Sequence, residues 1–100
     1  MSCTAGFVLQ ADGRWMTTKA PGDELYYGRD IAARFPGRTI ASAEIVGDPV
    51  AVTATDLQTT DTEAIVLVSG GNVGQVGSVH LRCTLDSGEV TDLTLWFKIV

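Results

Sequence analysis

The side chains with the strongest chemistry in this chain of 100 residues are one histidine and two cysteines. His80 lies close in sequence to Ser78 and Cys83, so a nucleophilic arrangement has to be considered. Such an arrangement needs the nucleophile, the base and an orienting carboxylate within hydrogen-bond reach. The alternation of the segment directs His80 away from the apolar face, toward solvent or a partner, and nothing places either nucleophile beside it. We predict that the protein is not an enzyme.

Metal and cofactor sites have equally little support. A zinc site needs three or four Cys or His ligands at motif spacing, and the chain holds only three such residues in all. Asp56, Asp61 and Glu63 could gather calcium but lack the spacing of a calcium loop, so a solvated acidic loop is the better interpretation. The run Gly70–Gly74 lacks the Gly-Lys-Ser/Thr ending of a phosphate-binding loop. We predict no cofactor.

Aromatic side chains are the candidates for binding a partner. These are Trp15, Tyr26, Tyr27 and Trp96. Trp96 falls on the face of its strand opposite Leu95 and Phe97, and aromatics are enriched where proteins dock. Two alternatives remain open for Trp96, namely a contact with a partner and packing beneath the N-terminal arm.

A long hairpin near the C-terminus is the element that must position these residues. Apolar and polar residues alternate with a period of two in both of its runs, on either side of a turn at residues 86–89. The apolar face comprises Leu81, Cys83 and Leu85, then Leu93, Leu95, Phe97 and Ile99. Val90 departs from this parity, which indicates a bulge or a frayed first pair.

Earlier segments predict further short strands. We expect strands over Leu25–Ile31, Ile40–Val46 and Val50–Thr55, with Asp56–Thr62 as a surface connection. Ala64–Ser69 is almost continuously apolar, which predicts a strand covered on both faces. The count is about seven strands, and no stretch has a sustained helical period, so we predict an all-β sandwich or barrel.

The N-terminal region predicts an arm. Phe7–Gln10 and Arg14–Thr17 are β-prone and flank an Asp-Gly turn, as in a hairpin. A two-stranded ribbon is marginal alone, so it must lie against the body or a partner. We divide the chain into an arm and linker at residues 1–24 and a sandwich at residues 25–100.

Composition limits the partners. The net charge is −5 and the seven basic residues are scattered, which argues against nucleic acid and anionic membranes. No apolar run reaches the roughly 20 residues of a membrane span. Residues 1–10 do not resemble a signal peptide, so we expect synthesis in a cytoplasm. Cys3 and Cys83 could form a bridge, but a reducing compartment favours two free thiols.

Two blocks of sequence resemble a family of small structural proteins of tailed bacteriophages. They are Leu25–Phe35 with Gly37–Ser42, and Leu67–Gly71 with Gly74, Val79–Leu85 and Gly88–Leu95. The family is described as fibre–tail adaptor or head–tail (neck) associated. The resemblance extends over residues 25–100 and is carried mainly by the order and spacing of strand and turn signals. Ile31, Val66 and Arg38 depart from its usual residues.

The resemblance implies an immunoglobulin-like β-sandwich and a non-enzymatic structural role in the tail or neck of the virion. Its partners would be other tail, fibre or neck proteins, and the chain would form a ring of copies after synthesis in the bacterial host cytoplasm. Alternatives are a capsid decoration protein and a free immunoglobulin-like binding module. The component of the virion that it contacts stays open.

Overall fold

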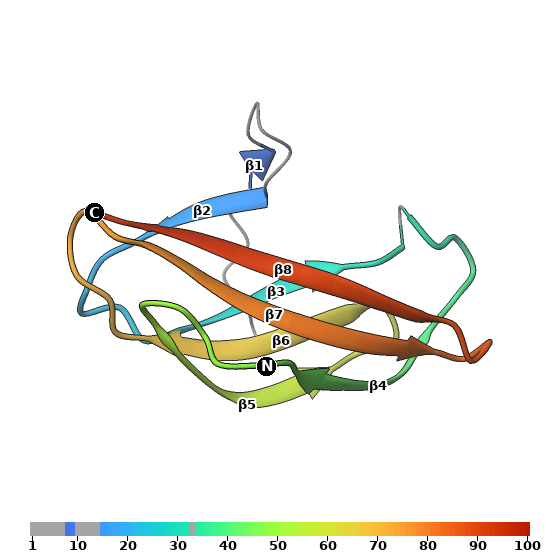
Figure 1. Ribbon diagram of the computed structural model, residues 1–100. Coiled ribbons are helices and arrows are strands. Elements are labelled where there is room, and N and C mark those ends of the chain that lie inside the picture. Colours follow the sequence, from blue (N-terminus) through green and yellow to red (C-terminus); the bar gives the residue numbers. More distant parts are fainter. Residues whose placement is uncertain (1–7, 10–14, 33) are drawn as a thin grey trace.

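The computed structural model describes residues 8–9, 15–32 and 34–100, with the backbone alone described for Val8, Leu9 and Trp15. These residues form eight strands and no helix (Figure 1). The strands are β1 (Val8–Leu9), β2 (Trp15–Lys19), β3 (Leu25–Asp30), β4 (Ile40–Ile45), β5 (Thr53–Thr59), β6 (Glu63–Ser69), β7 (Val76–Leu85) and β8 (Val90–Ile99). The prediction of an all-β fold is confirmed. A search of the described residues for a helix that could cross a membrane finds none.

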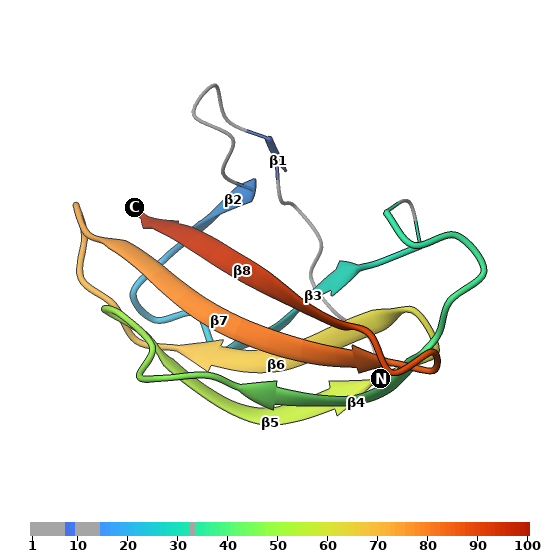
Figure 2. The same ribbon diagram turned by 45° about the vertical axis from the view of Figure 1, so that its right-hand side comes forward.

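The strands form two sheets that pack face to face as a sandwich. One sheet has the order β1-β2-β8-β7-β4 and the other has the order β3-β6-β5. Figures 1 and 2 show the two layers one on the other, with the β7–β8 hairpin running along the molecule. All pairings between these strands are antiparallel except that of β2 with β8.

The β7–β8 hairpin has the predicted faces. Leu81 pairs with Leu93 and Val79 with Leu95, and all four side chains are buried. The expected bulge or frayed pair at Val90 is wrong. Val90 pairs regularly with Thr84 and is 57% exposed on the outer face, while the next residue takes the core side. Val90 is next to the turn, at the end of the sandwich, where an apolar residue can face solvent without breaking the ladder.

The core lies between the sheets and joins them through aromatic contact. The rings of Tyr27 on β3 and Phe97 on β8 have centroids 4.9 Å apart at 79°, an edge-to-face pair. Burial of each large apolar side chain stabilises the fold by roughly 1.5–3 kcal/mol. Cys83 is buried in this core as a free thiol, as predicted. Burial raises the pKa of this thiol, and Cys3 lies outside the described residues.

The fifth strand differs from its prediction. The expected strand at Val50–Thr55 and the connection at Asp56–Thr62 are both misplaced, because β5 occupies Thr53–Thr59. Its register with β6 shifts between Thr55 and Gln58, and Asp56 there has a φ of 52°. This irregularity changes which residues face the core, so a period of two cannot be followed through it. Val50 makes only an isolated bridge to Ser78.

The central strand of the smaller sheet is covered on both faces. Ala64, Ile65 and Val66 are consecutive and all buried, and consecutive residues of a strand point to opposite faces. The strand β6 also has a hydrogen-bonded neighbour on each side, β3 and β5. The prediction from its continuous apolar run is therefore confirmed.

The N-terminal ribbon is joined to the larger sheet. Leu9 pairs with Trp15 and Val8 with Met16, as in the expected hairpin, while residues 10–14 between them lie outside the described part. The strand β2 continues onto the edge of β8 in parallel register. Of the two alternatives, the described part of the ribbon lies against the body of its own domain.

Candidate partner-binding surface

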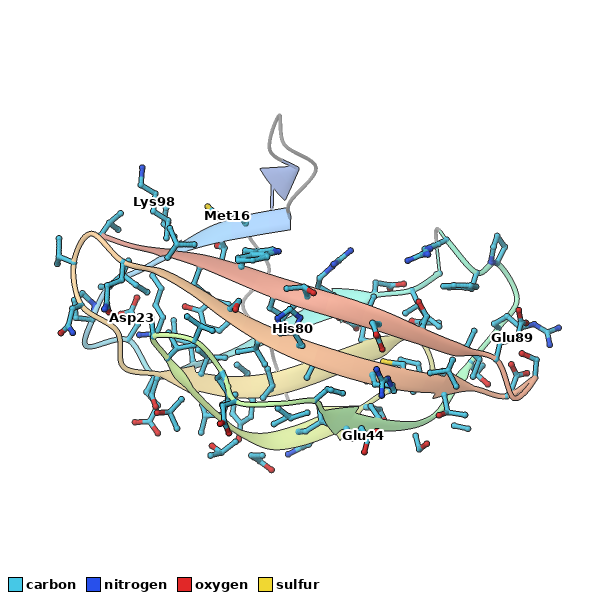
Figure 3. All side chains as sticks on the ribbon, in the orientation of Figure 1. Met16, Asp23, Glu44, His80, Glu89 and Lys98 are labelled. Atoms are coloured by element: carbon cyan, nitrogen blue, oxygen red, sulfur yellow. The ribbon has the colours of Figure 1, made fainter. Side chains whose placement is uncertain are left out.

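The outer face of the five-stranded sheet carries a group of apolar and aromatic side chains. We call it the Trp96 face and define it as Met16, Val50, Val76, His80 and Trp96. Trp96 on β8 is paired with Met16 on β2 and with Ser78 on β7, and Ser78 is in turn bridged to Val50. These four residues therefore form one row across the sheet. Figure 3 shows Met16 and Lys98 near one end of the sheet and His80 near the middle of the hairpin.

Exposure distinguishes this face from an ordinary sheet surface. Val50 is 54% exposed and Val76 is 43% exposed, although both are large apolar side chains. Trp96 and Met16 are half-buried. The rings of His80 and Trp96 lie edge to face with centroids 6.4 Å apart. A half-buried aromatic side chain beside exposed aliphatic groups is typical of a protein contact.

A charged row lies next to the Trp96 face. Arg82 and Asp92 pair across the hairpin, with Arg82 Nε donating to Asp92 Oδ1 over 2.9 Å. This hydrogen bond lowers the pKa of Asp92 and raises that of Arg82. Glu44 on β4 stands opposite Arg82 in register. Apolar residues beside a polar, charged margin are the arrangement of interface core and rim.

The same face shows why His80 is not placed for nucleophilic catalysis. His80 is exposed, and its Nδ1 lies 2.9 Å from Thr94 Oγ1. Cys83 is buried on the opposite face of β7, with a raised thiol pKa. Ser78 is on the side of His80 but is only 3% exposed. A search of the described residues for clusters of His, Cys, Asp or Glu that could hold a metal finds none.

A second polar group lies on the outer face of the smaller sheet. The hydroxyl of Tyr26 on β3 donates to Asp56 Oδ2 on β5, and Gln58 Nε2 donates to Asp56 Oδ1 over 3.1 Å. These two hydrogen bonds, that from Tyr26 first, lower the pKa of Asp56. The hydrogen bond between the Tyr26 hydroxyl and Asp56 also raises the pKa of Tyr26. Tyr26 is therefore held in place at the surface by a carboxylate.

The four aromatic residues singled out in the sequence are not brought together. Tyr27 is 1% exposed in the core, where it contacts Phe97, so it is a packing residue. Tyr26 and Trp96 lie on the outer faces of different sheets. The side chain of Trp15 lies outside what the structure describes. The sequence analysis missed Met16, Val50 and Val76. Of these, Val76 could have been found, because it falls on the same side of the alternating pattern as His80.

One buried cation was also missed. Lys19 is 1% exposed, and its Nζ donates to the carbonyl oxygens of Ala20 (2.9 Å) and Gly70 (2.6 Å). Burial lowers its pKa, and the nearby carboxylate of Asp23 opposes this effect. Because Gly70 follows β6, the ammonium group ties β2 to the end of the opposite sheet.

The protein is a two-sheet β-sandwich with exposed apolar side chains on the outer face of its larger sheet. A family model described as podophage GP4 fiber-tail adaptor protein gp77 matches residues 19–98, so the chain belongs to this family of phage fibre-tail adaptors. The resemblance seen in the sequence is thereby confirmed, and the family implies a place in the virion. No curated protein matches the chain.

Proposed function

We propose that this protein is a non-enzymatic adaptor of the phage tail, and that the Trp96 face is the surface by which it holds another tail or fibre protein. Family membership supports the adaptor role. The Trp96 face carries the assignment of the surface, because Val50, Val76 and Trp96 combine exposure with apolar character on one sheet. Residues of this kind release water when a partner covers them, which drives association.

The strand order supports the expected immunoglobulin-like sandwich. In such domains one sheet contains strands B, E and D side by side, and the other contains G, F and C. The order β3-β6-β5 and the order β8-β7-β4 correspond to these sets when the strands are lettered along the chain. The fold then supplies two broad outer faces and two sets of loops, which suits a part that must contact more than one neighbour.

A ring of copies is the assembly that we propose for the adaptor. Head-to-tail contacts between identical chains use two different surfaces and close when the rotation permits. The two outer faces of the sandwich differ in chemistry, one with the Trp96 face and the other with Tyr26 and Asp56. Such a domain has distinct surfaces for neighbouring copies and for other tail components.

Complementation of a phage that lacks this gene tests the proposed surface. Val76→Asp places a carboxylate on the Trp96 face, and Val90→Asp places one on the same sheet at its other end. Both valines are exposed, so neither change should unfold the domain. We expect particles with Val76→Asp to carry fewer fibres and to lose infectivity, while those with Val90→Asp resemble the wild type. Equal behaviour of the two folded variants would contradict the assignment of the surface.

A further inference from the structure

The strand β2 is attached to the sandwich differently from the other strands. It pairs with β8 in parallel, over Met16↔Trp96 to Lys19↔Ile99, in a sheet that is otherwise antiparallel. Parallel pairs are slightly less stable per residue than antiparallel ones. Figures 1 and 2 show β2 beside β8, on the side away from β7.

The described inward side chains of β2 are polar. Thr17 and Lys19 face inward and are buried, and neither belongs to the hydrophobic core. The core cluster of described residues draws on Tyr27 to Ile99. Removal of β2 would therefore break its ladder with β8 and the hydrogen bonds of Lys19, and it would take no side chain out of the described core cluster.

The segment after β2 is a short turn, which would serve as the hinge if β2 moved. Residues 20–24 form a tight turn in which Asp23 N–H donates to Ala20 O (3.0 Å) and Ala20 N–H donates to Asp23 Oδ2 (3.1 Å). Pro21 and Gly22 at its tip are exposed, and a Cβ at Gly22 would meet nothing within 4 Å. Five residues can extend over about 17 Å. Opening this turn would carry β2 away from its own β8.

The site that receives β2 makes a hydrogen bond with one side chain of β2, that of Lys19. The carbonyl of Gly70 stands where an ammonium group reaches it from position 19, and the amide of Val100 donates to Lys19 O over 2.9 Å. A strand with a lysine in the same register keeps the hydrogen bond to the Gly70 carbonyl, whereas a residue without a donor there loses it. A second copy of this chain carries this lysine.

We propose that β2 is exchanged between copies, so that β2 of one chain pairs with β8 of the next. Exchange of an identical element keeps every contact of the closed chain, so it costs little and leaves new contacts between copies to favour the assembly. The donor strand and the acceptor edge are different surfaces, so the contact is head-to-tail and can close as a ring. The proposal rests on the proposed function for its setting in the virion.

A disulfide trap tests the exchange. Thr18 and Lys98 are paired in register and both exposed, and adjacent strands lie about 4.8 Å apart, within reach of a disulfide. The variant carries Thr18→Cys and Lys98→Cys with Cys3→Ser, which leaves only the buried Cys83 as a further thiol. Particles that contain it are oxidised and run on a non-reducing gel. Exchange predicts a ladder of covalently linked chains, whereas linked monomers alone would overturn the proposal.

A second pair of cysteines serves as the control for the disulfide trap. Ser42→Cys with Thr84→Cys joins β4 and β7, which are paired and not exchanged, so it should give linked monomers under all conditions. The purified full chain is also oxidised over a range of concentrations. If the chain is absent from particles, the proposed function fails while the purified protein still tests the exchange. Linked monomers at every concentration would overturn the exchange and leave the adaptor role intact.

A hinge variant gives a second measurement. Deletion of Pro21 and Gly22 removes the residues that let β2 turn back onto its own domain, and a shortened hinge favours exchange. We expect light scattering to show oligomers at lower protein concentration than for the wild type. A monomer that melts at a lower temperature and shows no such shift would contradict the exchange.

Discussion

Tyr26 and Asp56 join the two edge strands of the smaller sheet across its central strand. The Tyr26 hydroxyl on β3 donates to the Asp56 carboxylate on β5, and Leu67 of β6 lies between Tyr26 and Thr55 in register. Asp56 can reach Tyr26 because it occupies the irregularity of β5, with a φ of 52°. The feature that disturbs the strand also places its carboxylate over the sheet.

Replacement of Tyr26 with Phe removes this donor and keeps the ring. We expect the pKa of Asp56 to rise toward the ordinary value, because the phenolic hydrogen bond stabilises the carboxylate. Titration of the Asp56 carboxyl carbon by NMR measures the change. Gln58→Ala is the control and should raise the pKa less, because Gln58 is the weaker contributor. An unchanged pKa in Tyr26→Phe would show that the hydrogen bond does not form in solution.

The same pair has a pH-dependent effect on stability. A carboxyl group whose pKa is lowered by folding stabilises the fold above its ordinary pKa, and this contribution is lost as the pH falls through the lowered value. The urea midpoints of wild type and Tyr26→Phe should therefore differ at neutral pH and converge in acid. A difference that persists below the lowered pKa of Asp56 would show that the hydroxyl group of Tyr26 affects stability independently of the charge on the carboxylate.

Truncation of Phe97 should cost much more stability than truncation of Trp96, although the two are neighbours on β8. Phe97→Ala removes a buried ring that contacts Tyr27 and should destabilise the fold by about 3–5 kcal/mol. Trp96 is on the outer face, so Trp96→Ala should cost much less stability and chiefly weaken attachment to a partner. Denaturant unfolding of both variants makes the comparison. Similar losses in the two would contradict the assignment of faces.

Lys19 should matter for stability and Lys98 should not. Lys19→Met leaves the carbonyls of Ala20 and Gly70 without their ammonium donor, which should cost about 1–3 kcal/mol. Lys98→Met removes an exposed ammonium group from the neighbouring strand and serves as the control. Thermal melts of both variants provide the measurement. A Lys19→Met protein that melts with the wild type would show that the apolar stem, and not the hydrogen bonds, holds β2.

Cys83 should be unreactive in the folded protein. Its thiol is buried and has a raised pKa, so the reactive thiolate is rare and shielded from reagent. Titration with a disulfide reagent should give the same folded-state signal for wild type and Cys83→Ala. After unfolding, the wild type should titrate one thiol more than the variant. A folded wild type that titrates one thiol more than folded Cys83→Ala would show that the β7–β8 hairpin opens.

The β7–β8 hairpin and β6 could be predicted from the sequence because the pattern of apolar and polar residues within each segment is enough to indicate a strand. Alternation from Leu81 to Ile99 and the apolar run before Ser69 each follow from which faces are covered. The extent of β5 could not be predicted, because the irregularity at Asp56 changes which residues of the strand face the core. The parallel pairing of β2 with β8 joins residues from opposite ends of the chain, and no local pattern encodes such a contact.

The candidate surface was only partly predictable for a related reason. Trp96 was placed on an outer face by parity alone, and the structure has it there. Tyr26 and Tyr27 are adjacent, so one must face out and the other in, and the register with β6 decides which. Val50 joins the surface through a bridge to Ser78 from outside any named strand, which requires the folded chain.

Immunogold labelling of purified virions tests the central claim most directly. Antibody against this chain is applied to particles of the encoding phage, and the position of gold is recorded by electron microscopy. The adaptor role predicts label confined to the tail, where fibres attach. Label spread over the head, or no label together with no peptide of this chain in the mass spectrum of the particles, would contradict it.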